Sequence, residues 1–291
     1  MAAEPLSVPV LAWYERAARD LPWRQPGVSA WAVLVSEIML QQTPVTRVLP
    51  VYAAWLDRWP TPADLAAAPA GDAVRMWGKL GYPRRALRLH ACAGEVTGRF
   101  AGRVPESVDD LLSLPGVGAY TARAVASFAF GQRHPVVDTN VRRVVARAVR
   151  GQGNAGLPSA TRDHAAVEAL LPADAASAAR FGVALMELGA LVCVARTPRC
   201  PVCPIAERCA WLVAGSPAYD GPVPRPQGFA GTDRQVRGLL LDVLRAAPGP
   251  VAQDALDVVW PDPVRRSRAL DGLVADGLVD PLPDGRYALP R

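Results

Sequence analysis

The sequence predicts a mainly α-helical protein with a small α+β module near its C-terminal end. Apolar residues recur at helical spacing as far as about residue 212, and no run there alternates with the period-2 pattern of a strand. Residues 215–231 are rich in proline and glycine, which predicts a linker. Beyond it, residues 232–247, 252–260 and 262–279 form three predicted helices. A Pro-Asp-Gly turn at 283–285 then predicts a hairpin.

We therefore expect a helical domain over 1–214, a linker over 215–231 and a winged-helix-like module over 232–291. The chain has a net charge of +5. The module carries 8 Arg and 9 Asp, a net charge of −1, so residues 1–231 carry +6. A basic large domain indicates a polyanionic partner such as nucleic acid.

The chain shows no signal for a membrane or for secretion. No apolar run approaches the roughly 18 residues that span a bilayer, and the first 20 residues lack a basic segment followed by an apolar core. Half of the residues are hydrophobic and a fifth are charged, as in ordinary globular proteins. We expect a cytoplasmic protein with no membrane partner.

Residues 31–43, WAVLVSEIMLQQT, form a predicted helix that contains a single carboxylate. At about 100° per residue, its apolar side chains cover nearly the whole circumference, so the helix should be buried. Glu37 lies between Val33 and Leu34 on that wheel. A buried carboxylate is costly unless it is paired, protonated or exposed to a cavity. Glu37 is therefore either a hydrogen-bonded structural acid or an acid kept for chemistry.

Four cysteines, Cys193, Cys200, Cys203 and Cys209, follow a Cys-x6-Cys-x2-Cys-x5-Cys spacing. Disulfides are not expected in a reducing cytoplasm, so a metal site is favoured. Structural zinc usually shows two Cys-x2-Cys pairs, and the spacing favours a [4Fe–4S] cluster while leaving zinc open. A zinc deaminase is excluded, because none of the three histidines provides His-x-Glu upstream. The fifth cysteine, Cys92, is predicted to be a small core residue.

The stretch LLSLPGVGAYTARAVASFAFG predicts two helices joined by a Pro-Gly-Val-Gly turn. Gly116 and Gly118 can adopt backbone angles that other residues resist, which would bring successive N–H groups to one side. The second helix, beginning near Ala119, would aim its N-terminal dipole the same way and help to bind one phosphate. A simple helix–helix connection would have the same sequence features. Asp138 occupies a predicted N-cap, which is a structural role by itself.

Together these segments resemble the helix-hairpin-helix DNA glycosylases, most closely the MutY-type adenine DNA glycosylases. The matching stretches are LPWRQ, VSEIMLQQTPV, WGKLGYPRRALRLH, LPGVGAYTARAVASFAFGQ, VVDTNVRRVVAR and ALMELGALVC, in order over about residues 6–212. The resemblance implies the helix-hairpin-helix glycosylase fold of two helical lobes with an iron–sulfur loop. In this family, the cysteine spacing is the signature of a [4Fe–4S] cluster, so Cys193, Cys200, Cys203 and Cys209 are its expected ligands.

The resemblance also implies the reaction. The family removes a flipped base from double-stranded DNA, here an adenine mispaired with 8-oxoguanine or guanine, by hydrolysing the N-glycosidic bond. Glu37 matches the general acid that protonates adenine at N7, with apolar surroundings that hold its pKa up. Asp138 matches the carboxylate that stabilises or traps the sugar cation. Tyr120 and Asn140 match the residues that position these acids and the water.

The same alignment implies the substrate contacts. Trp23, Arg24 and Glu187 align with the adenine pocket, and Gln42, Thr43 and Tyr82 align with the loop and wedge that contact the opposing base. Strand-cleaving relatives have a lysine nucleophile where this chain has Tyr120, and the sole lysine, Lys79, lies in another loop. We therefore expect a monofunctional glycosylase that acts as a monomer.

The chain departs from the family pattern at two points. It has Asp-Thr-Asn at 138–140 where the family usually has Asp-Gly-Asn, and residues 232–291 are too few for the Nudix-like domain that helps to recognise 8-oxoguanine. Two alternatives stay open. One is a thymine or uracil glycosylase for G·T or G·U mismatches, although such bases leave without N7 protonation. The other is a non-enzymatic iron–sulfur regulator of transcription.

Overall fold

The structure is a computed structural model that describes residues 4–222 and 228–291. Part of the predicted linker, residues 223–227, lies outside the described residues, as do residues 1–3 of the predicted helical domain. The chain divides into two compact units, which are described separately. The first comprises Met1–Val33, Glu106–Leu112 and Gly118–Arg225, and the second comprises Leu34–Pro105, Ser113–Val117 and Pro226–Arg291. The division predicted from the sequence, with a separate module over 232–291, stays a prediction.

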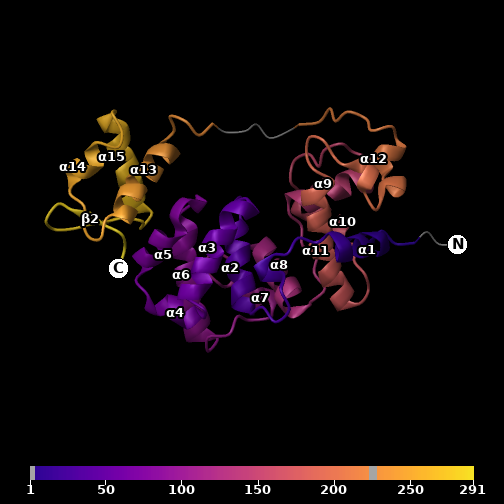
Figure 1. Cartoon of the computed structure of the whole chain (residues 1–291), viewed down its shortest axis with the longest axis horizontal. Coiled ribbons are helices and arrows are strands. Elements are labelled where there is room, and N and C mark those ends of the chain that lie inside the picture. The colour runs from indigo at the N-terminus through magenta and orange to yellow at the C-terminus, as the bar shows by residue number, and fades with distance from the viewer. Residues whose placement is uncertain (1–3, 223–227) are drawn as a thin grey trace. The chain divides into compact units, whose positions relative to one another are not determined.

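The first unit is built from helices, as predicted (Figure 1). Its helices are α1 (Ser7–Ala17), η1 (Pro22–Arg24), α7 (Val108–Leu112), α8 (Ala119–Phe130), α9 (Thr139–Ala148), α10 (Ala160–Glu168), α11 (Ala175–Leu191), η3 (Cys200–Val202), η4 (Ala206–Arg208) and α12 (Ala210–Val213). The apolar faces of α1, α9 and α11 form one core, with Val10, Val144 and Phe181 buried in it. Aspartate N-caps start two of these helices: Asp138 accepts from the Val141 N–H and Asp174 from the Ser177 N–H.

The second unit contains the other helices and the strands that the structure describes. Its elements are α3 (Val45–Arg58), α4 (Pro62–Ala67), α5 (Ala70–Trp77), η2 (Gly78–Leu80), α6 (Arg84–Arg99), α13 (Asp233–Ala246), α14 (Gln253–Asp257), α15 (Pro263–Ala275), β1 (Asp280–Pro281) and β2 (Tyr287–Ala288). Helix α2 (Ala30–Leu40) begins in the first unit and continues into the second. Three tryptophans hold α3 to α5: Trp55 packs edge-on to Trp59 and to Trp77 at centroid distances of 4.7 and 5.8 Å.

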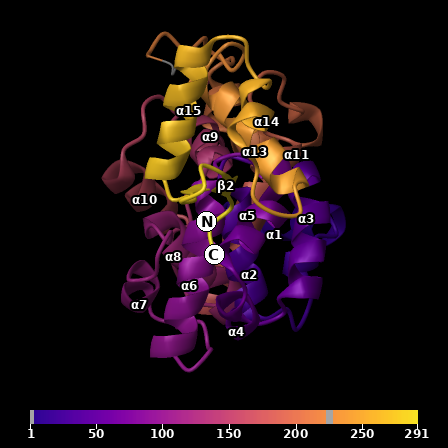
Figure 2. The ribbon, with the colours of Figure 1, turned by 90° about the vertical axis from the view of Figure 1, so that its left-hand side faces the viewer.

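The three predicted C-terminal helices and the hairpin are confirmed (Figure 2). Strands β1 and β2 pair antiparallel, with Asp280 opposite Ala288, and Val251 forms an isolated bridge to Tyr287. This segment also contacts α5 of the same unit. Arg75 Nη1 donates to the carbonyl oxygens of Arg245 and Ala247 at the end of α13. These contacts cap a helix C-terminus with a cation, which is favourable.

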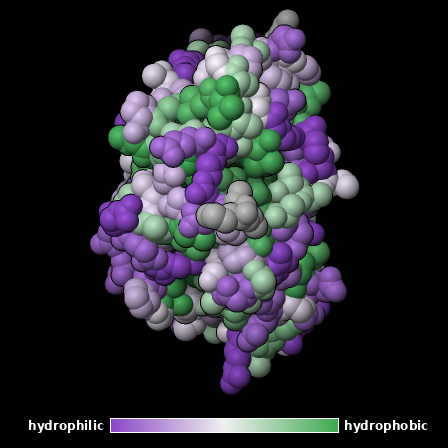
Figure 3. Space-filling view, turned by 90° about the vertical axis from the view of Figure 1, so that its right-hand side faces the viewer, coloured by the Kyte–Doolittle hydropathy of each residue, from purple (hydrophilic) through white to green (hydrophobic). Residues whose placement is uncertain are grey.

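The surface shown in Figure 3, on the side of the N-terminus, has hydrophobic patches separated by hydrophilic ones. Within residues 4–222 and 228–291, no helix has the length and apolar character needed to cross a membrane.

Candidate functional site

Helix α2 carries the buried acid predicted from the sequence. Every residue from 31 to 39 is buried, and Glu37 is 5% exposed. The neighbouring Ser36 is also fully buried, so the otherwise apolar helix buries two consecutive polar residues. The structure thus confirms that α2 buries an acid.

A buried arginine holds the end of α2 and the loop that follows it. Arg85 Nη1 donates to the carbonyl oxygens of Ile38, Met39 and Gln41 at 2.9, 3.0 and 2.6 Å. Its Nη2 donates to Thr43 Oγ1 at 2.9 Å. The side chain is 6% exposed, and burial lowers the pKa of Arg85 to about 10. The cation thus caps α2 at its negative end and fixes Thr43.

The same arginine orders the second predicted contact loop. Arg85 Nη2 donates to the Gly81 carbonyl at 2.9 Å, and its guanidinium lies 5.6 Å from the centroid of the Tyr82 ring. Thr43 Oγ1 donates to the Leu80 carbonyl at 3.1 Å. One buried cation therefore connects the loop that carries Thr43 with the loop that carries Tyr82.

Two residues in these loops have strained backbones. Gln42 has φ +57° and Tyr82 has φ +48°, a region that non-glycine residues rarely adopt. Both side chains are exposed, and the Tyr82 side chain is 49% exposed. Such strain persists only where the surroundings impose it, and it is concentrated at functional sites.

Asp138 combines the N-cap role with a second, side-chain contact. Its Oδ1 accepts from the Val141 N–H and its Oδ2 from Asn140 Nδ2, both at 2.7 Å. Asn140 Oδ1 in turn accepts from Arg143 Nη2 at 2.7 Å. Desolvation by burial raises the pKa of Asp138, although the hydrogen bonds from Val141 and Asn140 act in the opposite direction. The result is a half-buried carboxyl group held in one orientation.

Close packing of α9 on α11 fixes Asn140. Gly189 on α11 lies against it, and a Cβ placed on Gly189 would be 2.7 Å from Asn140 Cβ and 2.9 Å from its carbonyl oxygen. Arg143 Nη2 also donates to the Gly189 carbonyl at 2.7 Å. A glycine is required at 189 for this approach.

The helix–turn–helix segment forms as predicted, with α7 and α8 on either side of the turn. Gly116 has φ +80°, which favours glycine, and a Cβ there would lie 2.9 Å from Arg88 Cβ. Gly118 is the N-cap of α8, with φ −95°, so the expectation of an unusual angle is wrong for this residue. Tyr120 is the second residue of α8.

Glu187 is fully buried and surrounded by arginines. Its Oε1 accepts from Arg19 N and Nε at 3.0 and 2.7 Å, and its Oε2 accepts from Arg19 Nη2 at 2.7 Å. Arg24 Nη1 lies 3.0 Å from Glu187 Oε2, an ion pair that is poorly aligned for a hydrogen bond. Burial acts to raise the pKa of Glu187, but the bonds from Arg19 and the charge of Arg24 outweigh it, so the pKa is lowered. Trp23, beside Arg24, is buried.

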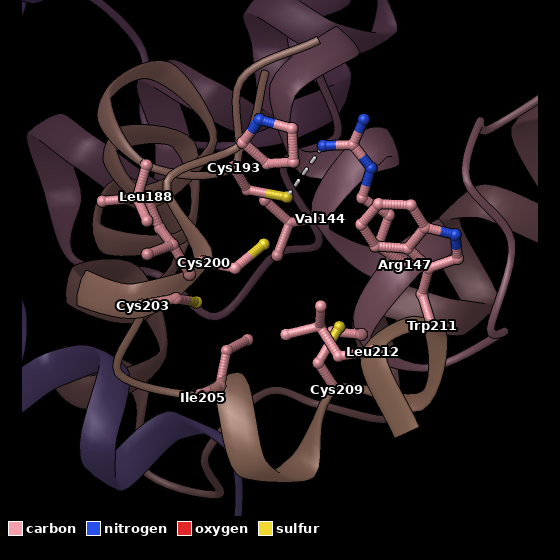
Figure 4. Close-up of a pocket in the computed structure, with 13 residues that line it drawn as sticks. Val144, Arg147, Leu188, Cys193, Cys200, Cys203, Ile205, Cys209, Trp211 and Leu212 are labelled. Atoms are coloured by element: carbon pink, nitrogen blue, oxygen red, sulfur yellow. Dashed lines mark hydrogen bonds between the residues drawn. The ribbon is translucent and has the colours of Figure 1, made fainter. Parts of the chain in front are cut away.

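The four spaced cysteines line one cavity of the first unit, and their sulfurs point toward a common space (Figure 4). Its other walls include Val144, Leu188, Ile205 and Leu212. Burial raises the pKa of Cys203 to about 11 and also raises the pKa of Cys200. Among the described residues, no three His, Cys, Asp or Glu side chains converge as the ligands of a single metal ion would. Cys92 lies apart, fully buried as predicted.

A cation covers one side of this cavity. Arg147 Nη1 donates to Cys193 Sγ at 3.4 Å and to the Val194 carbonyl at 2.8 Å. Its guanidinium lies 5.1 Å from the centroid of the Trp211 ring (Figure 4). Arg143, which bonds Asn140, also donates through Nε to the Cys193 carbonyl at 2.6 Å. The cysteine loop and the Asp138–Asn140 pair are thus connected through one arginine.

The structure groups the predicted site residues within each unit. The first unit brings together Asp138 with Asn140, Arg24 with Glu187, and the four cysteines; the second brings together Thr43, Tyr82 and their shared partner Arg85. Sequence reasoning missed Arg19, Arg85, Arg143 and Arg147. For Arg85 a signal existed, because it falls on the same helical face as the buried residues Leu89, Cys92 and Val96.

Comparison with known proteins identifies the family. A family model described as "HhH-GPD superfamily base excision DNA repair protein" matches residues 35–165. The adenine DNA glycosylase of Mycobacterium tuberculosis is 61% identical over 97% of this chain and 92% of that protein. The one of Mycolicibacterium smegmatis is 60% identical over 97% and 95%. The solved structure of a thermostable thymine-DNA glycosylase matches with 28% identity and a TM-score of 0.64, covering 72% of this chain and 95% of that chain. This chain therefore belongs to the adenine DNA glycosylases of the HhH-GPD superfamily of base excision DNA repair proteins, enzymes that hydrolyse the N-glycosyl bond of adenine in DNA.

Proposed function

We propose that this chain hydrolyses the N-glycosyl bond of an adenine mispaired with 8-oxoguanine or guanine in double-stranded DNA. It acts in the cytoplasm as a monomer and does not cleave the strand efficiently. The observation that carries the proposal is the buried Glu37 in the apolar helix α2. Adenine is a poor leaving group unless it is protonated, so its excision needs an acid that is kept from bulk water.

Each acid has one role in the proposed mechanism. Glu37 donates a proton to N7 of the adenine, and the bond from C1′ to N9 then breaks with its electron pair moving to the base. The sugar is left as an oxocarbenium-like cation, which the Asp138 carboxylate stabilises by charge or by a covalent bond to C1′. Water then bonds to C1′, any bond from C1′ to Asp138 breaks with its electron pair returning to the carboxylate, and the proton lost by the water restores the Glu37 carboxylic acid. Bonds from Asn140 and the Val141 N–H hold Asp138 in place, and Tyr120 helps to position the acids and the water.

The remaining predicted residues bind the substrate. Trp23, Arg24 and Glu187 hold the flipped adenine, and the Arg19 bonds to Glu187 keep the carboxylate ionised and oriented. Gln42, Thr43 and Tyr82 contact the opposing base, supported by Arg85. The N–H groups of the Gly116–Gly118 turn and the start of α8 bind one DNA phosphate.

We expect no efficient strand cleavage, because the chain has a single lysine and it is not at the position of the nucleophile. Strand-cleaving enzymes of this type form a Schiff base between a lysine amine and the sugar. Position 120 is a tyrosine, and Lys79 is 85% exposed with its Nζ 3.6 Å from Asp242 Oδ2. We therefore assign no nucleophilic lysine to the reaction.

The four cysteines of the cavity are the proposed ligands of a [4Fe–4S] cluster. Four thiols in an apolar cavity, with an N–H donor from Arg147 on Cys193, suit the donor set and the hydrogen bonding of such clusters. The raised pKa of Cys203 means that binding must displace its proton. The cluster would supply covalent cross-links within residues 193–209 and so fix the shape of this loop.

Single-turnover base release tests the proposal. Duplexes with A·8-oxoguanine, A·G, G·T or G·U pairs are incubated with excess wild-type protein, Glu37→Gln or Asp138→Asn. We expect adenine release by the wild type and a loss of about 10²- to 10⁴-fold in both variants. The matched controls are Glu95→Gln, an exposed acid on α6, and Asp174→Asn, the exposed N-cap of α11. Both should excise at the wild-type rate.

The alternative of a thymine or uracil glycosylase is not favoured, because the adenine DNA glycosylases are 61% and 60% identical over 97% of this chain, whereas the thymine-DNA glycosylase structure matches with 28% identity over 72% of it. Release of thymine or uracil that persists in Glu37→Gln would establish it and would refute the role of Glu37. Loss of bound iron and of absorbance near about 400 nm in Cys203→Ser, without loss in Cys92→Ser, is the outcome expected for the cluster.

A further inference from the structure

A groove in the second unit lies between the segment 78–88 and helix α13. We call it the basic groove. Lys79, Arg84 and Arg88 line it from one side, and Arg234, Arg237 and Arg245 line it from α13. The C-terminal segment has a net negative charge, yet the face it presents to this groove is cationic.

The acids in the basic groove are too few to neutralise these cations. Asp276 pairs with both Arg84, at 3.2 Å, and Arg237. Asp242 pairs with both Lys79, at 3.6 Å, and Arg245, at 3.5 Å. The two carboxylates thus serve four cations, and the pairs of the exposed Lys79 and Arg84 are weak and easily rearranged.

Two further arginines of the basic groove have no acidic partner among the residues that the structure describes. Arg88 and Arg234 are both exposed, and Arg234 Nη2 donates to the Gly228 carbonyl at 2.9 Å. Arg88 also adjoins the Gly116 turn, because a Cβ on Gly116 would lie 2.9 Å from Arg88 Cβ. Uncompensated cations on both walls are the electrostatic pattern of a phosphate-binding surface.

Aromatic side chains accompany these cations. Tyr82 lines the groove from one side and is 49% exposed, and Phe229 lines it from the other and is 61% exposed. The groove therefore presents an exposed aromatic ring from each of its two sides. Cations combined with exposed aromatic rings are typical of surfaces that bind unpaired nucleotides, whose bases stack on the rings.

We propose that the basic groove binds the DNA strand opposite the target adenine. In this assignment Arg88 and Arg234 contact phosphates of that strand, and Phe229 stacks on one of its bases. The inference rests on the proposed function, because Gln42 and Tyr82, assigned there to the opposing base, line the same groove. The segment after the linker is then part of the DNA-binding surface.

Hydrogen bonds to α5 hold α13, which forms one wall of the basic groove. Arg75 donates to the carbonyls at the end of α13, and Arg245 Nε donates back to the Val74 carbonyl at 3.0 Å. Gly71 N donates to the Pro290 carbonyl at 2.6 Å, where a Cβ on residue 71 would be only 2.4 Å from that oxygen. A helix α13 that is held on α5 in both directions by Arg75 and Arg245 can present its arginines in a constant geometry.

Salt-dependent binding tests the phosphate contact. The dissociation constant of a labelled A·8-oxoguanine duplex is measured by fluorescence anisotropy over a series of salt concentrations. Each phosphate contact adds about 0.9 to the slope of log K against log salt, so Arg234→Ala should lower the slope by about 1. The matched control is Arg286→Ala, an exposed arginine of the hairpin turn that pairs with Asp284 and does not line the groove. Equal slopes for all three proteins would overturn the proposal.

Strand assignment is tested with uncharged methylphosphonate linkages placed in one strand at a time. Neutralising the opposing strand should weaken wild-type binding and should have little further effect on Arg234→Ala. Coupling of Arg234 to the adenine-bearing strand instead would refute the strand assignment. Phe229→Ala should weaken binding about fivefold or more. Phe229→Tyr should bind as tightly as the wild type, because stacking needs only the aromatic ring.

The two proposals fail in different ways. A wild-type protein that releases no adenine would refute the proposed function. A wild-type protein that releases adenine while Arg234→Ala and Phe229→Ala bind as tightly as it does would refute the basic groove alone. The single-turnover rate at saturating protein should stay unchanged in the control Arg286→Ala, because this residue does not line the groove and touches no reacting atom.

Discussion

Replacing Gly189 by alanine tests whether the packing of α9 on α11 positions the proposed catalytic residues. The new methyl carbon would lie 2.7 Å from Asn140 Cβ and 3.0 Å from its carbonyl carbon. Ordinary contacts of a Cβ begin at 3.4 Å, so Asn140 or α11 must move by at least 0.7 Å. Asn140 cannot yield by rotating its side chain, because the clash involves its Cβ and backbone.

Two opposing effects act on stability. Alanine is favoured over glycine inside a helix by about 1 kcal/mol, whereas overpacking of a tight contact costs about 1–3 kcal/mol. Gly182→Ala, on the same helix, provides the matched control, because its Cβ would meet Phe128 at an ordinary 3.6 Å. Since the helix term is common to both variants, Gly189→Ala should be less stable than Gly182→Ala by about 1–3 kcal/mol.

Activity should fall with the displacement. The 2.7 Å bond from Asn140 to Asp138 would be broken or misaligned, and a shift of this size costs about 10- to 100-fold in rate. The assays are denaturant unfolding and single-turnover adenine release for the two variants and the wild type. Equal stability of the two variants, with wild-type excision by Gly189→Ala, would refute the view that this backbone contact positions Asn140.

Three further predictions concern buried charges. Burial raises the pKa of Asp138 above its ordinary 3.8, so its protonated form adds stability that is full below that value and is lost as the pH rises through the raised pKa. Asp138→Asn can keep the cap on the Val141 N–H and lacks this loss, so its stability relative to wild type should increase as the pH rises through the raised pKa, which denaturant unfolding over a series of pH values measures. Arg85→Leu leaves the α2 carbonyls and Thr43 without their donor and should cost about 3–5 kcal/mol, with weaker discrimination between 8-oxoguanine and guanine. Glu187→Gln should cost about 2–3 kcal/mol and slow adenine release, because Arg24 loses its counter-charge in a buried site.

Each of these predictions has a control at an exposed position. Asp174→Asn, an exposed N-cap, should show no comparable pH-dependent gain. Arg84→Leu and Glu15→Gln each break an exposed ion pair, and each should cost less than about 1 kcal/mol. A parallel pH dependence for the two aspartate variants, or equal losses for the buried and exposed charge variants, would contradict the reasoning from burial.

Features determined by neighbouring residues could be predicted from the sequence by itself. The circumference of α2 is apolar at nearly every position, which sufficed to predict that Glu37 is buried. The N-cap at Asp138 and the turn at Gly116 depend on a few adjacent residues. The C-terminal helices and hairpin were predictable because their periodicity and turn residues are local. The roles of individual residues came from the family resemblance, because residue spacing alone does not distinguish a structural acid from a catalytic one.

Only the tertiary structure decided which charges are buried together. Glu187 meets Arg19 across 168 positions of sequence, and Arg147 meets the Cys193 thiol across 46. No periodicity records such pairs, because they form only when separate helices pack and exclude water from both groups. For Arg85, helical periodicity indicates a buried position on α6 but not the groups that the side chain meets there. Arg85 reaches the carbonyl oxygens of Ile38 and Met39 only when α2 and α6 pack against each other.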